Sequence, residues 1–119
     1  MVFQLTRHAD GSWTEKVLHH FTGGADGASP FGGLTFGREG RLYGTATWGG
    51  LPLCSNGCGV AFSLKHAPGK WVEHVLWTFR NIADAYPTGD LITDSAGNIY
   101  GTTNGDFFTT FGSVFESAP

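Results

Sequence analysis

The feature that most constrains this chain is an internal repeat. Residues 13–21, WTEKVLHHF, align with residues 71–79, WVEHVLWTF, at an offset of 58 (71 − 13). Residues 40–45, GRLYGT, align with residues 97–102, GNIYGT, at an offset of 57 (97 − 40). Each copy must form the same supersecondary unit, and such units bury their core by stacking on one another. The repeat therefore restricts the chain to a modular architecture.

A third, partial copy of one element marks the two ends of the repeat. Residues 2–5, VFQL, match residues 61–64, AFSL. Residues 59–62, GVAF, match residues 112–115, GSVF, at an offset of 53 (112 − 59). The smaller offset indicates that the loop before this element is shorter in the second copy.

Each copy is predicted to contain four short strands and no helix. We divide the chain into a first repeat over residues 1–59 and a second over residues 60–119, which ends on the first strand of a further repeat. Nineteen glycines with abundant aromatic residues and only 14% charged residues are typical of short strands joined by tight turns. The predicted strands are residues 2–6, 13–21, 33–36 and 41–46, and then residues 61–65, 71–79, 90–93 and 98–103.

Four strands per repeat favour a β-propeller over a solenoid. The predicted fold is therefore all-β, with two four-stranded antiparallel blades of propeller type. Alternation in the second strand predicts Trp13, Glu15, Val17 and Phe21 on one face and Leu18 on the other. Aromatic residues that keep their type in both copies are predicted to lie in the core. They are Trp13, Trp71, Phe21, Phe79, Tyr43 and Tyr100.

The second copy resembles a known family of tandem repeats. Residues 84–87 and 89–103 look like the repeat of the GloVer-type tandem-repeat proteins, and residues 25–30 and 58–62 fit the same pattern. Proteins of this kind are bacterial, mostly exported or surface-anchored, and contain the repeat in long arrays. The resemblance implies a propeller-like array outside the cell or at its surface. It implies no activity and no catalytic residues.

The two cysteines, Cys54 and Cys58, lie four positions apart in one loop. In an exported protein such a pair is typical of a disulfide, which we favour. Two free thiols and half of a metal site are the alternatives, and the second would need further ligands. Closing so short a loop removes little entropy from the unfolded chain, so a disulfide here would mainly fix the loop.

The ionisable residues do not form a recognisable catalytic or metal-binding pattern. Among the five histidines, His8 and His66 occupy equivalent places after a strand, but His19, His20 and His74 stand where the other copy has a different residue, so we predict no metal ligands among them. Asp26, Asp84 and Asp94 sit in glycine-rich or serine-rich segments and are predicted to stabilise turns there. Glu15 and Glu73 are equivalent and have apolar neighbours, which predicts partial burial with a structural hydrogen bond. No nucleophile motif or phosphate-binding loop is present, and no cofactor is predicted.

The long loops differ most between the copies, and binding sites usually lie in such loops. The candidate binding residues are apolar and aromatic side chains that meet a glycan or a protein ligand. The alternative is that they pack against a neighbouring blade. They are Trp48, Leu51, Phe107, Phe108 and Phe111.

Composition excludes several classes of partner. The net charge is −3, and no run of basic residues is present, which argues against nucleic acid. No apolar stretch reaches the roughly 18 residues of a membrane span. The first residues lack the basic start and apolar region of a signal peptide, so an export signal is expected outside this chain.

The sequence thus predicts a non-catalytic propeller module that binds or scaffolds outside a bacterial cell. The alternatives are part of a propeller enzyme with a site in its central channel, or a purely structural repeat fragment. Two blades cannot close a ring, so we expect head-to-tail self-association and favour six blades. Residues 2–5 and 114–116 are copies of one strand and compete for a single place in such a ring. This surplus strand indicates either a longer array or a frayed end.

Overall fold

The computed structural model describes residues 1–106 and 108–118. It is all-β, as predicted, and every strand pairs antiparallel. Two three-residue 3-10 helices, η1 (Arg38–Gly40) and η2 (Ile82–Asp84), lie in connecting segments. The strands are β1 (Val2–Arg7), β2 (Trp13–His19), β3 (Thr35–Phe36), β4 (Leu42–Ala46), β5 (Val60–Ala67), β6 (Lys70–Thr78), β7 (Ile92–Thr93), β8 (Ile99–Thr102) and β9 (Val114–Ser117).

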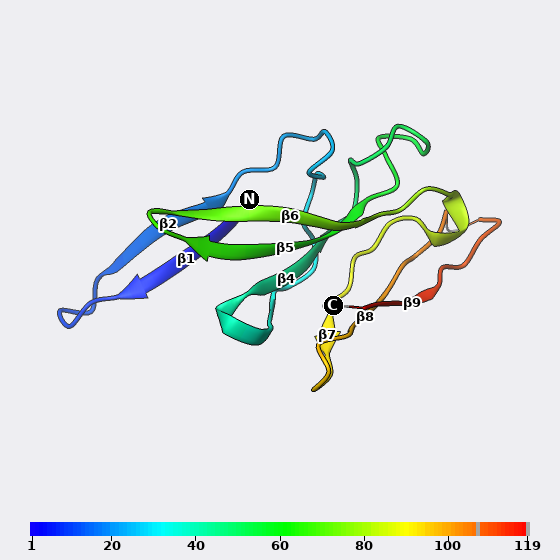
Figure 1. The fold of residues 1–119 in the computed structure, drawn as a ribbon. Helices are drawn as coiled ribbons and strands as arrows, with labels where there is room; N and C mark the ends of the chain where they lie inside the picture. Colours follow the sequence, from blue (N-terminus) through cyan, green and yellow to red (C-terminus); the bar gives the residue numbers. More distant parts are fainter. Residues whose placement is uncertain (107, 119) are drawn as a thin grey trace.

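The strands form three sheets, of two, four and three strands (Figure 1). The N-terminal sheet is the hairpin β1-β2, the central sheet has the order β3-β4-β5-β6, and the C-terminal sheet has the order β7-β8-β9. The predicted strands are present, but they do not divide into two four-stranded blades. The central sheet combines β3 and β4 of the first copy with β5 and β6 of the second, because the first strand of one copy pairs with the fourth strand of the copy before it. Within the described residues these sheets do not close into a ring.

The central sheet lies between the other two. Alternate residues of a strand point to opposite faces, and β5 shows this directly. Phe62 and Leu64 belong to a buried cluster with Val2 and Leu42, against which Leu18 of the N-terminal hairpin also packs. On the other face, Ala61 of β5 joins a second cluster that contacts the C-terminal sheet. That cluster comprises Cys58, Ala61, Phe79 and Ala85, with Cys54, Tyr86 and Phe115 packed against it.

The two interfaces between sheets repeat the same aromatic contact. Phe21 meets Phe62 edge to face, with ring centroids 5.1 Å apart and planes at 65°. Phe79 meets Phe115 in the same way, at 5.2 Å and 71°. Phe79 is the copy of Phe21, and Phe115 is the copy of Phe62. The structural repeat therefore extends beyond the strands to the way in which successive sheets stack.

Each copy also carries a β-bulge at the same place. The register between β1 and β2 shifts between Val2 and Phe3 and leaves Leu18 without an opposite residue. The equivalent shift between β5 and β6 leaves Leu76 unpaired. A bulge adds a residue to one strand and interrupts its alternation. The predicted assignment of the second strand to two regular faces is therefore wrong beyond Val17.

The prediction that Trp13 is a core residue is also wrong. Its side chain is 59% exposed, whereas its copy Trp71 is half-buried against the first cluster. Phe79 is buried, and Phe21, Tyr43 and Tyr100 are half-buried. Trp71 lies where the N-terminal hairpin covers the central sheet. No sheet of the described chain covers Trp13 in the same way, so residue type alone did not decide its burial.

Candidate functional site

The loop after β4 is held against the segment that follows β2. Ala28 and Trp48 form an isolated antiparallel bridge, with Ala28 N donating to Trp48 O at 2.7 Å and Trp48 N to Ala28 O at 3.0 Å. The Gly50 amide donates to Gly24 O at 2.8 Å. These backbone bonds fix the first turn of the loop, so Trp48 is presented by a defined backbone.

The other end of this loop is fixed by a disulfide between Cys54 and Cys58, with Cα atoms 5.0 Å apart. The Gly57 amide donates to Cys54 O at 3.0 Å and closes the turn between them. Gly57 has a φ of +85°, and a Cβ there would lie 2.2 Å from Gly49 O. Only glycine combines this backbone conformation with so close an approach. The loop is therefore compact and stiff.

A hollow lies between these two segments. Trp48 is half-buried in its wall, and its ring meets Phe31 edge to face at 5.6 Å. Phe31 itself is largely exposed. Leu51, from the same loop, is 36% exposed and does not line the hollow. The lining residues are Gly23, Ala28, Trp48, Gly49, Gly50, Pro52, Cys54, Asn56 and Gly57.

The loop after β8 is organised around one carboxylate. Asp106 accepts hydrogen bonds from the Thr109 hydroxyl at 2.5 Å and from the Thr110 amide at 2.7 Å. The Thr109 hydroxyl and then the Thr110 amide hold the pKa of Asp106 well below its usual range. Phe108 and Phe111, from the same loop, are largely exposed to solvent.

The structure does not bring all the candidate binding residues together. Phe108 and Phe111 do not line the hollow at Trp48. Phe107, the remaining candidate, lies outside the described residues. Figure 1 shows both loops on the same side of the view, away from the β1-β2 turn. The hollow thus has Trp48 from the predicted set, together with Asn56, which the sequence did not single out. Phe31, also not singled out, contacts the Trp48 ring but is not among the residues that line the hollow.

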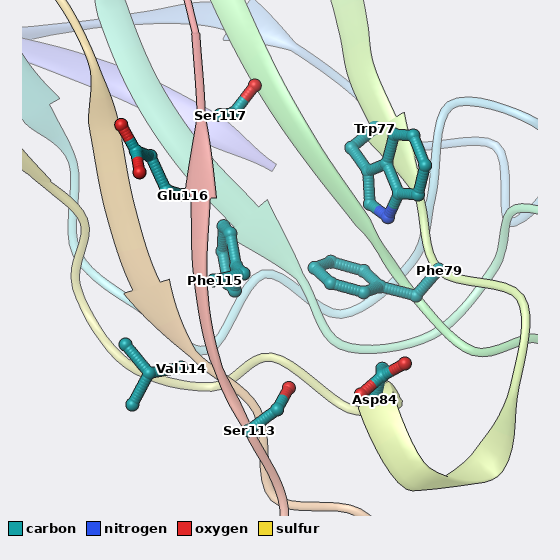
Figure 2. A pocket seen from close by; sticks show the side chains of 8 residues that line it. All are labelled: Trp77, Phe79, Asp84, Ser113, Val114, Phe115, Glu116 and Ser117. Carbon is teal, nitrogen blue, oxygen red and sulfur yellow. The ribbon is translucent and has the colours of Figure 1, made fainter.

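A groove between β6 and β9 was not predicted. Trp77 and Phe79 stand on one side of it and Phe115 on the other (Figure 2). Its lining is completed by Asp84, Ser113, Val114, Glu116 and Ser117. The sequence feature that could have indicated this groove is the match between β9 and β5. In the central sheet β5 is followed by a paired strand, β6, whereas no described strand follows β9.

Two acidic groups with shifted pKa values, Asp26 and Glu73, lie between the N-terminal hairpin and the central sheet. His19 Nε2 lies 3.2 Å from Asp26 Oδ2, and Asp26 also accepts from the Thr22 amide. Burial, and then the charge of Asp26, raises the pKa of Glu73 to about 7. Glu73 Oε1 has no hydrogen-bond partner, so the predicted structural hydrogen bond is absent. Its copy Glu15 is exposed.

The other predicted aspartates take part in turns. Asp94 accepts from the backbone amides of Ala96 and Asn98, both at 2.9 Å. Asp84 accepts from the side-chain amide of Asn81 at 2.9 Å. Among residues 1–106 and 108–118 no group of three or more histidine, cysteine or acidic residues is arranged to hold a metal ion. Nor is any helix in that part of the chain long and apolar enough to cross a membrane.

Comparison of the chain with protein-family models, with curated proteins and with solved structures finds no match.

Proposed function

We propose that this chain is a non-catalytic repeat module of propeller type that binds a glycan in the hollow at Trp48. The observation that carries the proposal is the aromatic pair Trp48 and Phe31 beside a loop stiffened by a disulfide. Aromatic rings offer flat apolar faces on which a sugar ring stacks. Asn56 and the backbone of Gly23, both exposed, supply polar groups that orient a ligand in the hollow.

The stiffness of the hollow favours binding over a merely structural role. A loop that is already ordered loses little conformational entropy when a ligand binds. The bridge at Ala28, the turn at Gly57 and the disulfide all fix the walls before any ligand arrives. A loop that served only to join two strands would not need this degree of order.

Catalysis is not part of the proposal. A propeller enzyme would place reactive groups at equivalent positions of several repeats, and Glu15 and Glu73 were the only such pair. Their environments differ, because Glu15 is exposed and Glu73 is half-buried beside Asp26. The pair therefore offers no shared chemical role.

The proposal includes a location outside a bacterial cell or at its surface, and head-to-tail self-association of the repeats. A disulfide persists in oxidising compartments, which agrees with export. The resemblance to GloVer-type repeats points to the same location. Stacking of like sheets through like aromatic pairs supports association of further copies by the same contact.

A glycan array probed with the labelled full chain tests the binding function. A saccharide identified there is then titrated against the chain by tryptophan fluorescence. Phe31→Ala removes the exposed ring that contacts Trp48 and should weaken binding at least fivefold, and Trp48→Ala should abolish it. Trp13→Ala, which removes an exposed tryptophan elsewhere, is the matched control. Absence of any glycan binding, or equal affinity for all three variants, would contradict the proposal.

A further inference from the structure

Three strands of the chain are copies of one another but have different neighbours. β1, β5 and β9 share the pattern VFQL, AFSL and VFES. β5 is paired on both edges, with β4 and with β6. Among the described residues, β1 pairs only with β2 and β9 pairs only with β8. Each end strand therefore has one open edge, and the two open edges are on opposite sides of the same repeated strand.

The side chains of β1 are exposed where those of β5 are buried. Phe62 and Leu64 are both 0% exposed. The equivalent residues of β1, Phe3 and Leu5, are 50% and 52% exposed. A half-exposed phenylalanine and leucine on one strand are not needed for its pairing with β2. They match the side chains that β5 buries with the help of the neighbouring β4.

The strand beside β5, β4, has a glycine, Gly44, where the ring of Phe62 packs, and we call this place the seat of the phenylalanine. A Cβ on Gly44 of β4 would lie 2.8 Å from Phe62 Cζ and 3.1 Å from Leu34 Cδ2, so the ring rests on a glycine beside a leucine. The second copy repeats this seat. A Cβ on Gly101 of β8 would lie 2.6 Å from Phe115 Cζ and 2.5 Å from Leu91 Cδ2.

We propose that β1 of a second copy of this chain takes the place of β9 beside β8. The proposal rests on the head-to-tail self-association proposed above and names the strands that meet. The register follows from β4 and β5, in which Gly44 lies opposite Phe62 and Leu42 opposite Leu64. It sets Phe3 of the second copy opposite Gly101, in the seat of Phe115, and Leu5 opposite Ile99.

The incoming strand fits this place better than β9. Ile99 now lies opposite Ser117, whereas its copy Leu42 lies opposite Leu64 in the buried central sheet. Leu5 would restore the apolar pair and bury its own side chain, which is 52% exposed, against Ile99, which is already buried. The open edge strand would also become an interior strand, with its backbone groups paired on both sides.

The negative charges beside Tyr100 also favour replacement of β9 by β1. Tyr100 donates a hydrogen bond to Asp94 at 2.9 Å, and its hydroxyl lies 3.5 Å from Glu116 Oε1 on β9. Two carboxylates therefore share one hydroxyl. Gln4 is the residue of β1 at the position of Glu116, and its side chain is uncharged. Replacing β9 by β1 removes one negative charge from beside Asp94.

The exchange also fills the groove between β6 and β9. β1 is one half of a hairpin, so its partner β2 arrives with it as the fourth strand. The order β7-β8-β1-β2 would then reproduce the order β3-β4-β5-β6 of the central sheet. Phe3 would meet Phe79 as Phe62 meets Phe21, which continues the stack of sheets from one chain into the next.

A disulfide that locks β9 to β8 tests the proposal. Tyr100 and Glu116 are directly opposite, so Tyr100→Cys combined with Glu116→Cys gives two thiols at a distance that a disulfide spans. Peptide mapping confirms that these two thiols are joined. Sedimentation velocity over a range of concentrations then compares the oxidised and reduced forms with the unmodified chain. The unmodified and reduced chains should associate, and the oxidised chain should stay monomeric.

Leu5→Ala provides a second test that does not depend on new cysteines. It should weaken association roughly tenfold or more, because Leu5 is buried only in the assembly. Leu53→Ala is the control, since Leu53 is a similarly exposed leucine on a loop. Association of the locked chain, equal effects of the two leucine variants, or a monomer at every concentration would each overturn the proposal. Glycan binding at Trp48 is measured separately, so its failure would leave this result standing.

Discussion

The two interfaces between sheets share the same aromatic contact, but they differ in the strands that surround it. Both centre on an edge-to-face pair of phenylalanines, Phe21 with Phe62 and Phe79 with Phe115. At the first interface β6 lies beside β5 and contributes Trp71 to the buried cluster. At the second no described strand lies beyond β9, and a groove remains there. The comparison teaches that a sheet interface in this chain is completed by the fourth strand.

The largest expected effect compares the phenylalanines of the two interfaces. Phe62→Ala should lower the free energy of unfolding by ~3–5 kcal/mol, because the ring is fully buried and its loss leaves a cavity. Phe115→Ala should cost about 1–2 kcal/mol, because its ring is only half-buried. Chemical denaturation at a concentration that keeps the chain monomeric measures both. Equal losses would show that the second interface is as complete as the first.

The next effect concerns the disulfide, which belongs to the second interface. Cys54 and Cys58 pack against the cluster there, and the bond closes a loop of five residues. Replacing both with serine should cost about 2 kcal/mol, close to the loop-entropy value for so short a loop. Glycan affinity should fall as well, because the walls of the hollow lose their constraint. Thiol titration of unfolded, unreduced protein should find no free thiol, and two free thiols would refute the bond.

A smaller effect on the free energy of unfolding is expected from Glu73, a carboxylate of β6 at the first interface. The pKa of Glu73 is raised to about 7 in the folded chain, above its usual value near 4.5. The protonated form is therefore favoured by folding, so this contribution is complete below about pH 4.5 and is lost as pH rises through 7. Because the side chain is only partly buried, the loss is on the order of 1 kcal/mol.

Glu73→Gln removes that titration and tests it directly. The difference in unfolding free energy between this variant and the unmodified chain should grow from pH 4.5 to pH 8, in favour of glutamine. Glu15→Gln is the matched control, since Glu15 occupies the equivalent position but is exposed. A pH-independent difference for Glu73→Gln, or the same pH dependence for both variants, would show that the two positions do not differ.

The repeat predicted the strands well because it aligned two independent instances of each. It did not predict how the strands divide into sheets, because that depends on which strand of the neighbouring copy is present. Trp13 and Trp71 illustrate the limit: they share a residue type, but only Trp71 is covered by another sheet. The bulges at Leu18 and Leu76 were also invisible, since an unpaired residue leaves no mark on a pattern of alternation.

The candidate site shows a similar division. Trp48 was predicted from its place in a variable loop, and the hollow beside it contains the expected aromatic side chain. Phe31 and Asn56 were not singled out. Phe31 meets Trp48 only because Ala28 is bridged to the loop, and Asn56 reaches the hollow only through the turn at Gly57. Contacts of this kind depend on loop geometry, which residue type and spacing do not encode.

The smallest expected effect on stability is at the loop after β8. Phe108 and Phe111 are almost fully exposed, so changing either to alanine should alter the free energy of unfolding by less than about 0.5 kcal/mol. The backbone of the loop is held by Asp106 and not by these rings. If the loop serves as an additional contact for ligand, the same variants should weaken glycan binding without any change in stability. Denaturation and fluorescence titration on one set of samples separate the two outcomes. A loss of stability above 1 kcal/mol would show that the rings pack in solution and would place this loop in the second interface.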